Sequence, residues 1–228
     1  MGFAGFDSLA YPGDVVMAWL KANTNLRFVG FYLAPAPSRP SSAWMSRRGV
    51  LAQQGWGFAP VYVGQQEGGG PGQHNLSSAQ GDVDGRDASQ LMQAAGFPTD
   101  SVVYLDCETG GAASPATTAY FSAWVDALTS VGQYRAGVYC SHTTAASLLG
   151  VRPNVSVWTF NLSGIGVGPG YPPNLPANDP SGSGVEVATI WQHSQNLAVA
   201  LHGGPVAQLK VDLDCASVPD PSQPAPIG

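Results

Sequence analysis

Charged residues are scarce in this chain of 228 residues. They make up 11% of the sequence, and the nine Lys and Arg residues against fifteen Asp and Glu leave a formal net charge of −6. Proteins that bind nucleic acid or anionic membrane surfaces do so through clustered basic side chains. The composition therefore argues against both kinds of partner.

Long apolar runs are also missing. No segment approaches the roughly 20 residues that a membrane-spanning helix needs, and the strand-like segment GFAGFDS begins at once, without the basic and apolar segments of a signal peptide. The sequence thus predicts no membrane span and no signal peptide.

Cysteine is rare, with three residues, which is too few for a disulfide scaffold. Cys107 and Cys215 each follow an aspartate within a strand-like segment, so alternation turns them away from it, and we expect both to be buried outside the barrel lumen. No CxxC motif or histidine cluster suggests a metal site, and the glycine-rich segment 65–75 lacks the Lys-Ser/Thr of a phosphate-binding loop. We expect neither a metal nor a cofactor.

Three aspartates in the segment GDVDGRDA raise the question of calcium binding. Asp82, Asp84 and Asp87 lack the glycine position and the closing glutamate of an EF-hand loop. We expect instead that Asp84 or Asp87 caps a helix, where a negative charge favours the first turn.

Short apolar segments alternate with helical patterns along the chain, and this alternation predicts a parallel sheet. Because there are eight strand-like segments, we predict a closed α/β barrel of the TIM type, with helices reduced or missing in its final third. A doubly wound sheet is second, because no GxGxxG follows the first strand. The barrel is expected over 1–217, followed by a proline-rich tail or linker at 218–228. The expected strands are 2–7, 27–34, 57–64, 102–108, 135–140, 156–162, 185–194 and 210–217, and the expected helices are 12–23, 41–54, 87–96, 114–132 and 142–150.

The segment VVYLDCETGG at 102–111 places two carboxylates at the end of an apolar strand. Asp106 and Glu108 would share one face of that strand and resist ionisation together, which is costly without a functional role. We expect burial and Asp106 to raise the pKa of Glu108.

The active site of such a barrel lies at the carboxyl ends of its strands. Five carboxylates and several aromatic side chains converge there, and we expect no Lys or Arg among them. Carboxylates that donate protons beside aromatic rings that stack on sugars are typical of glycosidases. Each residue also has a structural alternative: a turn cap for Asp7, a solvated strand end for Asp212 or Asp214, and the core for the aromatic residues. The predicted catalytic residues are Asp7, Asp106, Glu108, Asp212 and Asp214, and the predicted sugar-binding residues are Tyr32, Tyr62, Tyr139, Trp158, Trp191 and Gln192.

Five segments together resemble a known family: GFD near the start, VYLDCE, AGVYC, IWQ and VDLD. They are similar to the glycoside-hydrolase-like domain of actinobacterial cell-wall proteins, the Rv2525c-like group, and through it to the family 25 lysozymes. The resemblance covers about residues 2–217. It implies a barrel with fewer helices in its final third, Glu108 as general acid, and Asp7, Asp106 and Asp212 or Asp214 as supporting carboxylates.

Two functional hypotheses follow. The first is a glycoside hydrolase that acts on peptidoglycan or another amino-sugar polymer, located outside the cell or in the cell wall. The second is a cell-wall module that binds glycans without cleaving them. The tail could connect either of them to further domains.

Overall fold

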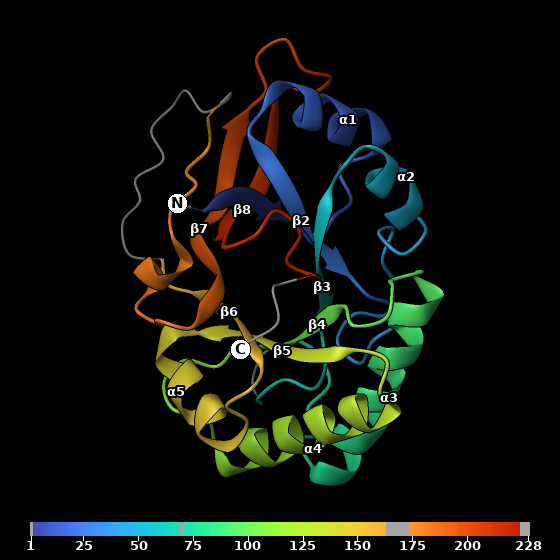
Figure 1. The fold of residues 1–228 in the computed structure, drawn as a ribbon, viewed down its shortest axis with the longest axis vertical. Helices are drawn as coiled ribbons and strands as arrows, with labels where there is room; N and C mark the ends of the chain where they lie inside the picture. The colour runs from blue at the N-terminus through green and yellow to red at the C-terminus, as the bar shows by residue number, and fades with distance from the viewer. Residues whose placement is uncertain (1, 69–70, 163–173, 224–228) are drawn as a thin grey trace.

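The computed structural model describes residues 2–68, 71–162 and 174–223. Eight strands form a closed barrel in which each strand pairs with the next and the last pairs with the first, which confirms the predicted α/β barrel (Figure 1). The strands are β1 (Phe3–Asp7), β2 (Leu26–Tyr32), β3 (Gly57–Tyr62), β4 (Val102–Cys107), β5 (Arg135–Ser141), β6 (Ser156–Phe160), β7 (Ala188–Ala200) and β8 (Gln208–Ala216).

One helix follows each of the first five strands. Beyond β6, the described part of the chain contains only a short 3-10 helix, η1 (Pro180–Ser183), as expected for a thinned final third. In Figure 1, α1 and α2 cover one side of the barrel, and α3, α4 and α5 cover the opposite side. The helices are α1 (Asp14–Asn23), α2 (Arg48–Gln53), α3 (Ser78–Ala94), α4 (Pro115–Val131) and α5 (His142–Val151).

The direction of β8 corrects the prediction of a wholly parallel sheet. Neighbouring strands from β1 to β7 are parallel, but β8 runs antiparallel to both β7 and β1. A hairpin can join antiparallel neighbours, so the chain needs no crossover helix between β7 and β8. This hairpin takes the place of the helix that a regular barrel would have there.

Large and small side chains alternate inside the lumen. A Cβ atom at Gly5 would lie 2.4 Å from the Phe28 ring, and one at Gly137 would lie 2.6 Å from Tyr104. These glycines on β1 and β5 therefore make room for aromatic rings from neighbouring strands. The result is a filled core, which supports the residues at its mouth.

The start of α3 is a second correction, because the expected helix began at residue 87. The helix begins at Ser78, and the Ser77 hydroxyl caps it by accepting a hydrogen bond from the Gln80 amide at 3.2 Å. Cβ atoms at Gly81 and Gly85 would lie 2.4 and 2.5 Å from carbonyl oxygens of α4. Glycines that suggest a loop in the sequence thus let two helices pack closely.

Asp84 and Asp87 consequently lie inside α3, and neither caps it. The carboxylate of Asp84 is buried and accepts hydrogen bonds from Gln65, Gln80 and Tyr120 at 2.7–3.2 Å. Asp87 accepts a hydrogen bond from Tyr62 at 2.9 Å. These aspartates fasten α3 to β3 and α4.

Helix α2 is shorter than the expected helix 41–54. Residues 43–47 form turns, and the Ser42 hydroxyl accepts a hydrogen bond from the amide of Trp44 rather than capping a helix. Trp44 is fully buried, and its indole donates to the carbonyl of Ser8 at 3.0 Å. Burial of this large side chain holds the segment in a turn before the helix begins.

The described part of the predicted tail lies against the barrel. Asp220 accepts a hydrogen bond from the amide of Phe58 at 2.9 Å, Ser222 accepts one from the amide of Val102 at 2.8 Å, and Gln223 donates to the Ser101 hydroxyl at 2.7 Å. All three contacts are at the amino ends of β3 and β4. The packed chain therefore continues past the expected boundary at residue 217 and covers the end of the barrel opposite the predicted site.

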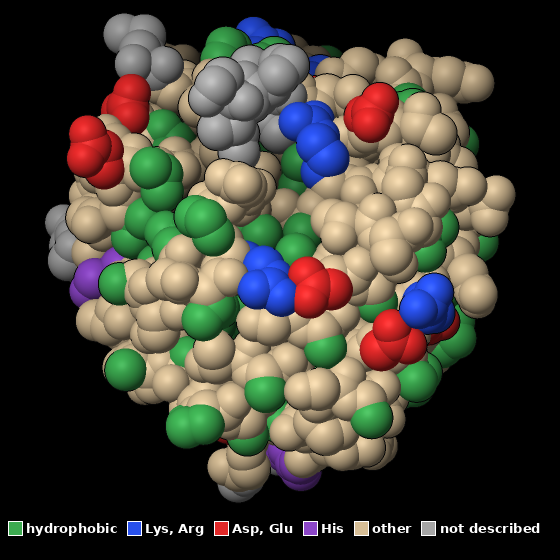
Figure 2. All heavy atoms as spheres, turned by 60° about the horizontal axis from the view of Figure 1, so that its bottom comes forward, with side chains coloured by type: hydrophobic (Ala, Val, Ile, Leu, Met, Phe, Trp, Pro, Cys, Tyr) green, Lys and Arg blue, Asp and Glu red, His purple; other side chains and the backbone are tan. Residues whose placement is uncertain are grey.

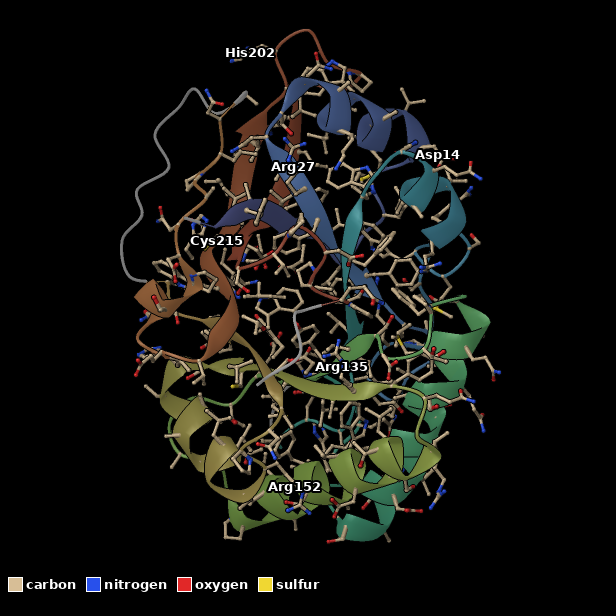
Figure 3. All side chains as sticks on the ribbon, viewed as in Figure 1. Asp14, Arg27, Arg135, Arg152, His202 and Cys215 are labelled. Atoms are coloured by element: carbon tan, nitrogen blue, oxygen red, sulfur yellow. The ribbon has the colours of Figure 1, made fainter. Side chains whose placement is uncertain are left out.

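Surface charges are sparse and the cysteines are unpaired, in agreement with the low content of charged residues and of cysteine. On the face drawn in Figure 2, acidic and basic side chains are scattered singly or in adjacent pairs among neutral ones. Cys107, Cys140 and Cys215 are free and buried, and burial was the expectation for Cys107 and Cys215. Cys215 is labelled in Figure 3. In the described ranges no helix combines the length and the apolar character needed to cross a membrane.

Candidate active site

A cleft of about 870 Å³ opens at the carboxyl ends of the parallel strands. Four of the five predicted catalytic carboxylates line it, and so do two of the predicted sugar-binding residues. Its walls come from the segments after β1 to β4 and from the β7–β8 hairpin. The predicted residues on its surface are Asp7, Asp106, Glu108, Asp212, Tyr32 and Tyr139.

The register between β1 and β8 explains how Asp212 reaches the cleft. Asp7 is the last residue of β1 and pairs with Asp212 in the middle of β8. Because β8 is antiparallel, the mouth of the barrel meets the middle of this strand rather than its carboxyl end. Asp214 therefore lies one layer deeper, opposite Gly5.

Asp7 is held by two hydrogen bonds. Tyr32 donates to its Oδ1 at 2.7 Å, and Gln192 donates to its Oδ2 at 2.8 Å. Gly30 lies beside it on β2, where a Cβ atom would stand 2.5 Å from the Cβ of Asp7. The glycine is required here because the two strands leave no space for a side chain.

Gln192 connects two of the carboxylates instead of lining the cleft. The Tyr139 hydroxyl donates to its Oε1 at 2.9 Å, which directs its amide nitrogen towards Asp7 and towards Asp212, the latter at 3.3 Å. The side chain is 1% exposed. The expected sugar-binding residue is thus placed where it orients the carboxylates.

The β7–β8 hairpin orients Asp212 from its other side. Asn196 adopts a left-handed conformation with φ of 57°, beside an irregularity in the pairing of β7 with β8. Its backbone amide donates to Asp212 Oδ1 at 2.6 Å. Both oxygens of Asp212 therefore have fixed donors, as do both oxygens of Asp7.

Asp106 and Glu108 differ in their exposure although both face the cleft. Asp106 is 5% exposed, and its Oδ1 has no hydrogen-bond partner among the described residues. Glu108 is exposed within the cleft. On this face of the strand, Asp106 thus occupies the inner, buried position and Glu108 the outer, exposed one.

Burial raises the pKa of every carboxyl in this cluster. It raises the pKa of Asp7 to about 7, with the negative charge of Asp212 adding to the effect, while the hydrogen bonds from Tyr32 and Gln192 oppose it. Burial also raises the pKa of Asp106 well above its ordinary value, with further contributions from the charges of Glu108 and Asp7. The cluster therefore keeps protons at a pH at which ordinary carboxyls have lost them.

The pKa of Glu108 is raised by burial, as expected, because the cleft walls limit its hydration. The charge of Asp212 adds to this rise, and the repulsion between Glu108 and Asp106 raises the pKa of Asp106. Burial likewise raises the pKa of Asp212, although the Asn196 amide and the charge of Lys210 oppose the rise. Glu108 and Asp212 therefore influence each other across the open space.

Asp214 and Trp158 form the floor beneath the cleft. The Trp158 indole donates to Asp214 Oδ1 at 3.0 Å, and the Trp158 ring packs edge-on against Tyr139 with centroids 5.0 Å apart. Asp214 is fully buried, and burial raises its pKa well above the ordinary value, with the charges of Asp7 and Asp212 adding to the effect. These two predicted site residues support the cleft from below and do not line it.

Tyr62 and Trp191, which we expected at the cleft, face away from it. Tyr62 bonds to Asp87 and packs against Trp124 of α4, and the Trp191 indole donates to the carbonyl of Asn161 at 3.0 Å. Successive side chains of a strand alternate between its faces. Both residues lie on the outer face, where aromatic side chains pack in the core between strands and helices.

Several cleft residues were missed by the sequence analysis, and two of them contradict the expected absence of Lys and Arg. Lys210 shares a face of β8 with Asp212, so strand alternation could have identified it, whereas no sequence signal indicated Arg39. Gln66 and Glu67 lie in the loop after β3, beyond the reach of strand alternation. The residues missed include Arg39, Gln66, Glu67, Gln195, Asn196 and Lys210.

Within residues 2–68, 71–162 and 174–223, no group of three or more His, Cys, Asp or Glu side chains is arranged to hold a metal ion. The arrangement can donate a proton from Glu108 into an open cleft. It can also accept hydrogen bonds at Asp106.

Comparisons with known proteins agree with the barrel fold. The sequence model of a family described as "Rv2525c-like, glycoside hydrolase-like domain" matches residues 18–193. No curated protein is significantly similar to the chain.

Solved structures show the same fold at low sequence identity. The Tat-secreted protein Rv2525c of Mycobacterium tuberculosis is 18% identical with a TM-score of 0.60, and the match covers 95% of this chain and 96% of that one. A family 25 glycosyl hydrolase from Bacillus anthracis is 14% identical with a TM-score of 0.59, over 95% and 89% of the two chains. A bacterial lysozyme from Streptomyces coelicolor is 12% identical with a TM-score of 0.60, over 98% of both chains.

Proposed function

Because the chain belongs to the Rv2525c-like, glycoside hydrolase-like family, we propose that it is a glycoside hydrolase acting on peptidoglycan or another amino-sugar polymer. The observation that carries the proposal is the cleft itself, where an exposed glutamate of raised pKa faces an ordered set of aspartates. Solved structures with this fold include a lysozyme and a family 25 glycosyl hydrolase.

Glu108 is the proposed general acid. Glycosidic bond cleavage requires a proton on the leaving oxygen, and a carboxyl of raised pKa still carries that proton near neutral pH. Glu108 is the cluster member that solvent and a polymer reach most easily. The charge of Asp212 strengthens its hold on the proton until transfer.

Asp106 is the proposed partner that faces the substrate. Protein donors occupy both oxygens of Asp7 and both of Asp212, whereas Asp106 Oδ1 has no described donor. Asp106 Oδ1 is buried, so we propose that the other carboxylate oxygen of this cleft-lining residue accepts a hydrogen bond from an acetamido N–H or from water. Asp212, together with Asp7 above its pKa of about 7, then provides negative charge that stabilises an oxocarbenium-like transition state.

A cleft that binds glycan without turnover is the alternative function. It would be favoured if the segment between β6 and β7 filled the groove. The part of this segment that the structure describes, 174–184, contributes no residue to the cleft surface. The described part of this segment thus leaves the cleft unfilled, which supports catalysis over binding alone.

We place the substrate, and hence the protein, outside the cell or in the cell wall. One similar structure is described as a Tat-secreted protein. A polysaccharide is the proposed partner, and further domains linked through the C-terminal tail are compatible with it.

The test is digestion of purified peptidoglycan, with mass identification of any new reducing end. Glu108→Gln keeps the shape of the side chain but removes the transferable proton, so we expect a rate loss on the order of 10²–10⁴. Melting temperature should be kept or raised, because a source of like-charge repulsion is removed, and glycan binding should persist.

Two outcomes would redirect the proposal. Equal turnover by the wild type and by Glu108→Gln would place the acid elsewhere. A wild type that binds an amino-sugar polymer tightly but cleaves none would establish the binding function instead.

A further inference from the structure

The charges on the cleft walls are unevenly distributed. On the side formed after β3 and β4, all the charged lining residues are acidic: Glu67, Asp106 and Glu108. On the side formed by the neighbouring strands β8, β1 and β2, the cations Lys210 and Arg39 flank Asp7 and Asp212. The cleft thus has an acidic half and a half that carries positive charge.

Arg39 is held in place by its own loop. Its backbone pairs with Ala36 through two hydrogen bonds of 2.8 and 2.9 Å, and its guanidinium donates to the carbonyl of Leu9. The guanidinium also lies over the ring of Tyr32, 5.5 Å from the centroid. A planar cation fixed in this way can bind a carboxylate with little further loss of side-chain entropy.

Neither cation is in direct contact with a carboxylate of the described residues, although the charge of Lys210 acts on Asp212. The Nε of Arg39 is buried and has no described acceptor. If the two cations served only to balance Asp7 and Asp212, direct ion pairs with these aspartates would be expected.

We propose that Arg39 and Lys210 bind a carboxylate carried by the substrate glycan. Such a glycan would lie across the cleft with its anionic sugar on the β8–β1–β2 side and its scissile bond at Glu108. The acidic side of the cleft would repel a carboxylate. The uneven distribution of charge therefore also sets the direction in which the glycan lies across the cleft. This inference rests on the proposed function and narrows its substrate to glycans with an acidic sugar.

The test compares two forms of one glycan. Peptide-free strands of alternating N-acetylglucosamine and N-acetylmuramic acid carry a lactyl carboxylate on every second sugar, and conversion of these groups to methylamides removes the charge. We expect the wild type to prefer the charged form roughly tenfold in kcat/KM, mainly through KM, because a hydrogen bond to a charged group is stronger than one to a neutral group. The preference should weaken at high salt.

Substitutions then assign the preference to the two cations. Arg39→Gln and Lys210→Gln should each reduce the preference for the charged glycan in kcat/KM several-fold, and Arg39→Lys should restore part of it. Arg27→Gln is the matched control: Arg27 is exposed near the opposite end of β2 (Figure 3) and should leave the preference unchanged. Lys210 is exposed, so its variant should fold even if the loop that carries Arg39 is disturbed.

The results separate this inference from the proposed function. Equal activity on both glycans, or an unchanged preference in both Gln variants, would overturn the carboxylate site and leave the hydrolase intact. If the wild type cleaves neither form, the proposed hydrolase fails, and dissociation constants for the same two glycans decide the inference: a preference lost in the variants supports it, and equal affinities overturn it.

Discussion

Asp7 couples the chemistry of the cleft to the stability of the fold. Burial and the charge of Asp212 raise its pKa from 3.8 to about 7. The folded state therefore binds this proton more tightly than the unfolded chain does. The resulting stability is fully present below the unfolded pKa and is lost as the pH rises through the folded value.

We predict that the free energy of unfolding falls between about pH 4 and about pH 8, with Asp7 contributing at most about 4 kcal/mol to that fall. In Asp7→Asn the fall should be smaller, because the titrating proton is gone, even if the new amide fits its neighbours poorly. Urea denaturation at several pH values measures this slope.

Asp82→Asn provides the control for the slope. Asp82 is about half exposed and pairs with Arg86 on the surface of α3. Its replacement should leave the pH dependence as in the wild type. A slope in Asp7→Asn that equals the wild-type slope would show that Asp7 titrates normally.

The sequence predicted correctly which side chains face the cleft where the alternation of side chains along a strand was followed. Asp106 and Glu108 share the cleft face, as their spacing indicated. Tyr62 and Trp191 are aromatic residues near strand ends, but each lies one position out of phase with the lumen. Residue type suggested sugar binding for both, and alternation decided against it.

At the scale of elements, the approach of β2 to β1 sets the position of the first carboxylate. A Cβ atom at Gly30 would lie 2.5 Å from the Cβ of Asp7 and 3.3 Å from the Trp158 ring. Both contacts are with rigid atoms of the core. The strand pair can therefore accept only glycine at this position without shifting the aspartate.

We predict that Gly30→Ala destabilises the protein by about 1–3 kcal/mol and lowers activity more than it lowers the folded fraction. Gly49→Ala in α2 is the control, since a Cβ atom there meets nothing within 4 Å and alanine favours a helix by about 0.5–1 kcal/mol. Thermal unfolding and turnover are compared for both variants. A fully active Gly30→Ala would show that Asp7 tolerates displacement.

Helix α3 shows why local patterns misplaced an element. Its first ten residues contain two glycines and three aspartates, which suggest a loop by propensity. In the folded protein Gly81 and Gly85 contact α4, and Asp84 and Asp87 bond to tyrosines. These partners are distant in sequence, so propensity alone could not indicate the helix.

At the scale of the whole molecule, the segment after β8 closes the barrel at the end opposite the cleft. Asp220 Oδ1 accepts from the Phe58 amide and also from the amide and hydroxyl of Ser222. Removal of this acceptor would leave the amide of Phe58, a residue that is 2% exposed, without its partner. The segment thus contributes to the stability of the entire barrel.

We predict that Asp220→Ala lowers the free energy of unfolding by about 1–3 kcal/mol, because a buried donor is left unpaired. Deletion of residues 219–228 should cost more. Asp82→Ala removes an exposed ion pair and should cost under about 1 kcal/mol. Chemical denaturation of the three variants measures the order, and a deletion as stable as the wild type would show that the segment is only a tail.

Strand order, the barrel class and the thinned final third follow from the sequence alone, because local periodicity indicates the strands and the approximate positions of the helices, and the order of elements restricts the topology. The convergence of Asp7, Asp106 and Glu108 follows too, since parallel strands end at one edge.

Tertiary structure alone decided the antiparallel course of β8, which brings Asp212 rather than Asp214 to the cleft. It also placed Arg39 over Tyr32 and Gln192 between two aspartates. These arrangements depend on contacts between residues up to 185 positions apart. Such contacts leave no local pattern, because their geometry exists only once the barrel has closed.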